Sequence, residues 1–212
     1  MTEHLHEPRA PAGIGLVLTH GAGGDARAPL LVALGEAFAE RGVTVVRYDL
    51  PYRQASPSGP PRPSGAAKDR DGLREAVAAM RARVRGSVFL GGHSYGGRQA
   101  SILAAGEPGL ADALLLLSYP LHPPRRPAEL RTAHLPNLRT PALFAHGSRD
   151  PFATRDEIEA ARRLIPAATA LVGLEGAGHD LFRAPGRAGA DAAAEIAVAF
   201  LAFADQVCAD RV

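Results

Sequence analysis

The sequence predicts a single α/β domain, built as a three-layer α/β/α sandwich around a mostly parallel sheet of about six strands. Its 212 residues suit one domain with a substantial core. Short apolar runs alternate with amphipathic stretches of helical period, which is the order that produces βα units and a parallel sheet. We assign residues 13–212 to this domain. Residues 1–12 are polar and contain proline, and we assign them to a flexible N-terminal tail.

Six apolar runs of strand length predict the sheet, and they lie at residues 14–21, 43–50, 87–92, 113–121, 140–148 and 168–176. Helical patterns fill the connections between them, at residues 29–42, 68–85, from 95 onward, 154–165 and 188–208. Residues 51–67 are rich in Pro, Gly and Ser and show no period. A long irregular segment of this kind in a compact domain is usually functional or mobile.

Charge and cysteine content narrow the function classes. Lys and Arg total 24 against 22 Asp and Glu, which gives a formal net charge of +2. The arginines are scattered rather than gathered in one stripe, so we expect no nucleic-acid partner. The single cysteine, Cys208, excludes a disulfide within the chain.

The N-terminal stretch has no apolar core of signal-peptide length, and no later run reads as apolar for long enough to cross a bilayer. We therefore expect a soluble cytoplasmic protein without a membrane partner. His4 and His6 could bind a metal weakly, but two histidines without further ligands lack the ligand count of a metal site. We expect no metal and no cofactor, and the oligomeric state is left open.

The stretch "VFLGGHSYGGRQA", residues 88–100, contains a candidate catalytic serine. It runs from a buried strand directly into a helix, and Gly92 and Gly96 remove side chains that would collide at so sharp a turn. Ser94 stands at the apex with its hydroxyl pointing outward, in the GxSxG pattern of a nucleophile elbow. Because glycine is common in this chain, the pattern alone also fits a Gly-rich turn that happens to hold a serine.

A serine hydroxyl becomes a nucleophile when a histidine, held by a carboxylate, takes its proton. Functional groups in such a sheet gather beyond the carboxyl ends of the strands. Asp150 and His179 directly follow two successive predicted strands downstream of Ser94. Each alone also fits an ordinary loop residue, but in the order Ser, acid, His they predict a catalytic triad. Asp180, adjacent to His179, and Asp156, inside a predicted helix, are the rival acids.

The tetrahedral intermediate also needs backbone N–H donors aimed at its oxyanion. We expect one donor at Tyr95, the residue after the nucleophile, and the other in "THGAGGD" after the first strand, at Ala22 or failing that at Gly23. The alternative for this glycine-containing loop is a phosphate cradle. It lacks the GxGxxG spacing and a Walker lysine, which argues against nucleotide binding.

These residues make the chain resemble an α/β-hydrolase, and in particular the small KANL/Tex-type predicted hydrolases, distant relatives of the dienelactone-hydrolase group. The resemblance spans residues 16–181 and rests on "HGAGG", "VVRYDLPY", "GGHSYGGRQAS", "SYPLHPPRRPAELRTAHL", "HGSRDPF" and "GHDL". It implies a minimal fold lacking the first two strands, with Ser94, Asp150 and His179 as the triad. The family commonly has Lys and Met beside the elbow serine, where this chain has His93 and Tyr95, so the resemblance implies no shared substrate.

The segment between residues 119 and 141 is too short for a helical cap, so we expect an open cleft without a cap domain. This segment begins at the carboxyl end of a predicted strand, beside Ser94. Four of its residues are therefore candidates for lining the substrate site: Tyr119, His122, Arg125 and Arg126. Gly23, from the loop after the first strand, is a fifth candidate. The two arginines could favour an anionic acyl group, or could simply be solvated loop residues. Tyr48, Asp49 and Tyr52 could also border the cleft, but a structural role comes first for them.

The function predicted from these residues is serine-nucleophile hydrolysis of a small or accessible carboxylic ester or related acyl compound, through an acyl-enzyme intermediate. Two other classes stay open. One is a non-catalytic protein-binding scaffold that keeps the fold, because a fold does not dictate function. The other is an acyltransferase or perhydrolase, which would use the same triad with an acceptor other than water.

Overall fold

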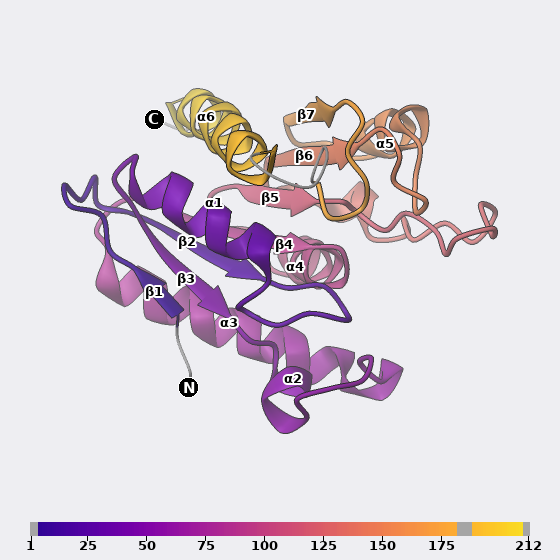
Figure 1. Ribbon diagram of the computed structural model, residues 1–212, viewed down its shortest axis with the longest axis horizontal. Coiled ribbons are helices and arrows are strands. Elements are labelled where there is room, and N and C mark those ends of the chain that lie inside the picture. The colour runs from indigo at the N-terminus through magenta and orange to yellow at the C-terminus, as the bar shows by residue number, and fades with distance from the viewer. Residues whose placement is uncertain (1–3, 182–187, 210–212) are drawn as a thin grey trace.

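The computed structural model describes residues 4–181 and 188–209. Seven strands form one sheet in the order β1-β3-β2-β4-β5-β6-β7 (Figure 1). They are β1 (His4–His6), β2 (Ile14–Thr19), β3 (Val43–Tyr48), β4 (Val88–His93), β5 (Leu114–Leu117), β6 (Ala142–Gly147) and β7 (Thr169–Leu174). Strands β2 to β7 are all parallel, as their sequence alternation with helices predicts.

The N-terminal segment corrects two expectations. Residues 1–12 were expected to be a flexible tail, but His4–His6 pairs antiparallel with β3, with His4 opposite Arg47. Arg47 Nε donates a hydrogen bond of 2.7 Å to His6 Nε2, which ties this edge strand to the sheet. The sheet therefore has seven strands where about six were expected, and the added strand β1 lies at its edge. A three-residue strand is too short to show a period in the sequence.

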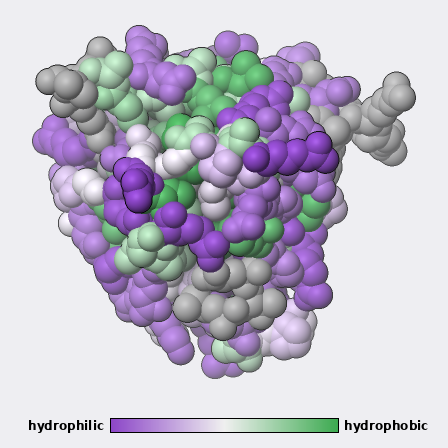
Figure 2. Space-filling model, turned by 90° about the vertical axis from the view of Figure 1, so that its left-hand side faces the viewer, coloured by the Kyte–Doolittle hydropathy of each residue, from purple (hydrophilic) through white to green (hydrophobic). Residues whose placement is uncertain are grey.

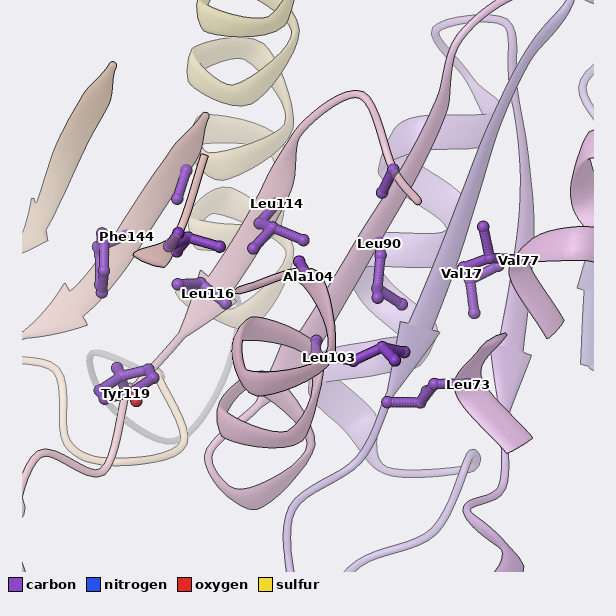
Figure 3. Packing of buried hydrophobic residues seen from close by; sticks show 14 of the residues in the cluster. Val17, Leu73, Val77, Leu90, Leu103, Ala104, Leu114, Leu116, Tyr119 and Phe144 are labelled. Carbon is purple, nitrogen blue, oxygen red and sulfur yellow. The ribbon is translucent and has the colours of Figure 1, made fainter. Parts of the chain in front are cut away.

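Helices cover both faces of the sheet, which confirms the three-layer architecture (Figure 1). The helices are α1 (Pro29–Ala39), α2 (Pro51–Ala55), α3 (Ala66–Arg83), α4 (Tyr95–Gly106), α5 (Arg155–Arg162) and α6 (Ala188–Ala209). Helices α1 and α6 pack on one face, around Leu16 and Phe89, and α3, α4 and α5 pack on the other, around Val17 and Leu90. Neighbouring strand residues thus point to opposite layers. Figure 3 shows the second layer, where Leu73 and Leu103 face Leu90.

Helix α6 corrects the expectation that no segment could span a membrane. By length and composition alone, its stretch Asp191–Ala209 is apolar enough to do so. In the structure this helix packs on α1 and the sheet, and the fully buried ring of Phe200 meets Phe38 and Phe89 edge-on at 5.9 and 5.2 Å. Core packing thus accounts for the buried part of this stretch, which is 39% of it. Figure 2 shows one end of the molecule, with mostly hydrophilic residues and small apolar patches between them.

The two connections that carry few helical signals lie near the carboxyl ends of the strands. Residues 51–67 are less irregular than their composition indicates, because they contain α2 and the short 3-10 helix η1 (Pro63–Gly65). The connection from β5 to β6 holds only a second 3-10 helix, η2 (Leu135–Asn137), so this connection carries no cap domain.

Candidate active site

Ser94 is the single residue between β4 and α4, and its backbone is strained. Its φ of 50° and ψ of −114° lie outside the regions that L residues normally adopt. Space explains the flanking glycines: a Cβ at Gly92 would lie 2.5 Å from the backbone of Gly96 and Gly97, and one at Gly96 would lie 2.5 Å from the carbonyl oxygen of His20. The turn predicted from the sequence is therefore formed with the hydroxyl at its apex.

Three side chains from three strand ends meet at this apex. His179 Nε2 lies 2.9 Å from Ser94 Oγ, and His179 Nδ1 lies 2.8 Å from Asp150 Oδ2. Asp150 follows β6 and His179 follows β7. Because the carboxylate can only accept, Nδ1 carries the proton, and Nε2 is left to accept the serine proton. The geometry is that of an activated serine nucleophile.

The acid of this arrangement is held in its ionised form. Burial raises the pKa of Asp150, but the hydrogen bond from His179, the charge of His179 and the N–H of Phe152 together lower it below its usual value. A second histidine, His146, lies behind the carboxylate, with Nδ1 3.8 Å from Asp150 Oδ2. Asp156, one of the rival acids, lies exposed in the first turn of α5.

His179 is held from both sides by residues that the sequence analysis did not assign to the site. His93 Nε2 donates a 2.7 Å hydrogen bond to the backbone oxygen of His179, and the two rings lie 4.9 Å apart. Burial lowers the pKa of His93 to about 4, so its ring is neutral at physiological pH. The ring of Phe152 lies 4.3 Å from that of His179 on another side. These contacts restrict the imidazole to the orientation that reaches Ser94.

The loop after β2 passes beside Ser94, since a Cβ at Gly21 would lie 3.4 Å from Ser94 Cβ. Two side chains of α2 hold its carbonyl groups. The Tyr52 hydroxyl lies 3.1 Å from the Gly21 oxygen and 3.0 Å from the Ala22 oxygen. Arg53 donates to the Ala22 oxygen at 3.2 Å and to the Gly24 oxygen at 2.8 Å.

His20 fixes the start of the same loop. Its Nε2 accepts from the Leu50 N–H at 3.1 Å, so Nδ1 carries the proton and donates to the Gly21 oxygen at 2.8 Å. Burial lowers the pKa of His20, which keeps the ring neutral and this pattern intact. A peptide C=O and the next N–H point in opposite directions. Holding the Gly21 oxygen therefore orients the Ala22 N–H away from His20 and Tyr52.

Tyr95 is the first residue of α4, and the first N–H groups of a helix have no partner within it. Its amide and that of Ala22 are the two predicted oxyanion donors. Two cavities share Ser94, Ala22 and Phe152 in their linings. The first, of about 360 Å³, also reaches Gly23 and His179. The second, of about 490 Å³, also reaches Tyr95.

Two of the predicted lining residues lie in the core instead. Tyr119 is 1% exposed, and its ring packs beside Phe144 (Figure 3). The backbone turns at Ser118, whose φ is 46°, and this turn sends Tyr119 inward. His122 is 6% exposed, and its Nδ1 lies 2.9 Å from the oxygen of Pro123. Neither residue is among the described lining of the two cavities that contain Ser94.

The two predicted lining arginines are also placed elsewhere. Arg125 and Arg126 are exposed, Arg126 pairs with Glu129 at 3.0 Å, and neither lines the cavities beside Ser94. The same connection instead contributes Arg131 to the second cavity, together with Arg98 from α4. Arg98 stands four residues after Ser94 in the elbow phrase, so one helical turn of spacing could have indicated it.

Comparisons with known proteins agree with this fold. A family model described as an alpha/beta hydrolase domain matches residues 12–207. An α/β serine hydrolase homologue from Coxiella burnetii is 18% identical with a TM-score of 0.73, covering 94% of this chain and 90% of that one. A lidless α/β serine hydrolase from Xanthomonas campestris is 18% identical with a TM-score of 0.74, covering 94% and 88%. A dienelactone hydrolase from Anabaena variabilis is 22% identical with a TM-score of 0.72, covering 94% and 90%. The chain belongs to the α/β-hydrolase family.

Proposed function

We propose that this protein is a serine hydrolase that cleaves a carboxylic ester or related acyl compound through an acyl-enzyme intermediate. The observation that carries the proposal is the hydrogen-bonded series Asp150–His179–Ser94, with distances of 2.8 and 2.9 Å, at a strained turn. A serine in a purely structural turn has no need of an imidazole that is hydrogen-bonded in turn to a buried carboxylate.

In the first half of the reaction, Ser94 Oγ attacks the carbonyl carbon of the ester while His179 Nε2 takes the hydroxyl proton. The C=O electron pair moves onto the oxygen, which becomes the oxyanion. Collapse of this intermediate breaks the bond to the leaving alcohol, and the imidazolium returns the proton to that oxygen. Asp150 stabilises the imidazolium and stays ionised, because the Nδ1 proton remains on His179.

In the second half, water takes the place of the alcohol. His179 takes a proton from the water, whose oxygen attacks the acyl carbon, and the imidazolium then protonates Ser94 Oγ as the carboxylic acid leaves. The amides of Ala22 and Tyr95 are the proposed donors to the oxyanion in both halves. Each donor of this kind lowers the barrier by about 3 kcal/mol. The cytoplasmic location stays a prediction from the sequence.

Covalent labelling tests the nucleophile directly. Incubation of the folded protein with a fluorophosphonate, followed by peptide mass spectrometry, is expected to place one adduct on Ser94. Ser101, the next serine along α4, is the internal control, because it bonds with His134 and is expected to stay unmodified. Folded protein that gains no adduct and does not hydrolyse p-nitrophenyl acetate would refute the proposal.

A further inference from the structure

The second cavity beside Ser94 has a strongly one-sided charge. Three arginines, Arg62, Arg98 and Arg131, line it. Among the described residues of its lining there is no Asp or Glu. The remaining lining includes several prolines from residues 60–63 and the ring of Phe152. A positive cavity with partly apolar walls attracts an anion more strongly than an open surface does, because less water screens the charges.

Arg98 is the arginine of this cavity that most clearly indicates a ligand. It lies one turn after the nucleophile on α4, where its N–H donates to the Ser94 oxygen at 3.0 Å. Its side-chain Nε is buried and has no hydrogen-bond partner in the part of the chain that the structure describes. Buried donors are nearly always bonded, so an orphaned guanidinium nitrogen indicates a missing partner.

Other arginines of the fold show how unusual this is. Arg53, which is 7% exposed, donates to four backbone oxygens, at Ala22, Gly24, Ser56 and Gly59. Arg74 forms ion pairs with Asp71 and Glu107. Within the described residues, the structure records neither kind of partner for the Arg98 side chain.

Nearby groups do not neutralise the cavity. Arg131 is half-buried, and within the described residues the recorded hydrogen bond of its guanidinium goes to the oxygen of Pro120, at 3.2 Å. Burial, and then the charge of Arg98, lower the pKa of Arg131. The carboxylate of Asp69 is engaged by the Tyr52 N–H at 3.0 Å and by the Tyr95 hydroxyl at 2.7 Å. Among the described lining residues, Arg98 and Arg131 therefore have no carboxylate partner, and an anionic ligand would supply one.

The position of His179 indicates which part of the substrate occupies the second cavity. His179 must deliver its proton to the leaving alcohol, so the alcohol part lies on its side of Ser94, in the first cavity. The second cavity contains Tyr95, one of the proposed oxyanion donors, and His179 does not line it. The acyl part of the substrate is left to occupy the cavity that holds the arginines.

We propose that the acyl part of the substrate carries a carboxylate, which Arg98 and Arg131 bind, so that the preferred substrates are half-esters of short dicarboxylic acids. This inference rests on the proposed function. A planar guanidinium pairs with a carboxylate through two parallel hydrogen bonds, and the orphaned Nε of Arg98 is one of the donors in that fork. A cavity of about 490 Å³ is large enough for such an acyl chain.

Steady-state kinetics with two matched esters test the preference. Monomethyl glutarate and dimethyl glutarate differ by one methyl group and one charge. We expect the wild type to have the higher kcat/KM for the half-ester, and Arg98→Gln to reduce that preference about 10- to 100-fold, the range of a hydrogen bond to a charged group. Arg131→Gln acts in the same direction. Arg126→Gln, whose guanidinium pairs with Glu129 outside the cavity, leaves the preference unchanged.

Stability separates a binding role from a structural one. Because Arg98 Nε has no partner to lose, Arg98→Gln is expected to leave the melting temperature unchanged or to raise it. Arg98→Lys keeps the charge and loses the fork, and so retains only part of the preference. A wild type that hydrolyses both esters equally well, or an Arg98→Gln variant that keeps the wild-type preference, would overturn the inference.

Binding to the Ser94→Ala variant separates this inference from the proposed function. In calorimetric titrations we expect monomethyl glutarate to bind more tightly than dimethyl glutarate. Adding Arg98→Gln to this variant, or raising the salt concentration, should weaken the binding of the half-ester. That result supports the anion site even if the wild type gains no fluorophosphonate adduct and does not hydrolyse p-nitrophenyl acetate, which would refute only the hydrolase proposal. Equal affinity for the two esters, or tighter binding of inorganic phosphate than of the half-ester, contradicts a carboxylate site.

Discussion

The two sides of the site around Ser94 are built in different ways. On one side, Ser94, Asp150 and His179 are side chains that would take part in the reaction, and each stands at the end of a strand. On the other side, the loop from residue 20 to residue 24 would contribute only backbone groups, and side chains that lie behind it hold them in place. A change on the first side should therefore abolish chemistry, whereas a change on the second should only weaken it.

The largest effect is expected for Ser94→Ala. The nucleophile is lost while the elbow stays, so kcat for p-nitrophenyl acetate should fall by about 10⁴-fold or more. Circular dichroism and the melting temperature check that the fold persists. If the variant kept a tenth of the wild-type kcat, the reacting group would lie elsewhere.

Asp150→Asn should come next, with a fall in kcat of about 10³- to 10⁴-fold. An amide at this position no longer fixes the proton on His179 Nδ1, so Nε2 is not free to act as the base. The matched control is Asp180→Asn, which changes the rival acid beside His179 in the sequence and should alter kcat by less than about tenfold. The reverse order of effects would assign the acid to Asp180.

A smaller effect is expected on the loop side, from Arg53→Met. This change keeps most of the side-chain volume and removes the donors to the Ala22 and Gly24 oxygens. Loss of loop order should lower kcat about 10-fold, well short of the effect of losing a triad member. The free energy of unfolding should also fall by about 1–3 kcal/mol, because buried carbonyls lose their donor.

Arg81→Met is the control for that change. Arg81 also donates to backbone oxygens, at Gly109 and Leu110, but these lie just before β5, at the opposite edge of the sheet. It should leave kcat unchanged. An Arg53→Met variant with wild-type kcat would show that the loop does not need this support.

The sequence predicted the reacting side of the site better than the supporting side. The elbow could be predicted because glycines at fixed offsets are required by local backbone clashes, and Asp150 and His179 because strand ends share one edge of a parallel sheet. The supports were missed because Arg53 reaches the loop across 29 or more residues of sequence, and no local pattern records such a contact.

The prediction for the segment after β5 was wrong for a related reason. Tyr119 was expected at the cleft because it follows a strand end. The positive φ at Ser118 reverses the direction of the side chain that follows, and a non-glycine residue gives no sign of this in the sequence. The edge strand His4–His6 was missed because it forms only when β3 offers an edge to pair with. Long-range contacts and single backbone torsions thus account for most of the differences.

The smallest effect concerns stability in mild acid, and it tests how the side with Ser94, Asp150 and His179 is held. Burial lowers the pKa of His93, against the triad, and of His134, on the face covered by α4, to about 4 in each case, whereas an unfolded chain titrates near 6.5. Between these two values the unfolded state binds more protons than the folded state. The stabilisation that the buried, neutral histidines contribute is therefore fully present above about pH 6.5 and is lost as the pH falls toward 4. Each such histidine contributes up to about 1.4 kcal/mol per pH unit to the slope of the free energy of unfolding against pH.

We expect His93→Gln to reduce this slope between pH 6 and 5, measured by urea unfolding, by about the amount for one proton. If the slope of His93→Gln matched the wild type, His93 would not be held neutral against His179, and its support of the triad would have to be abandoned.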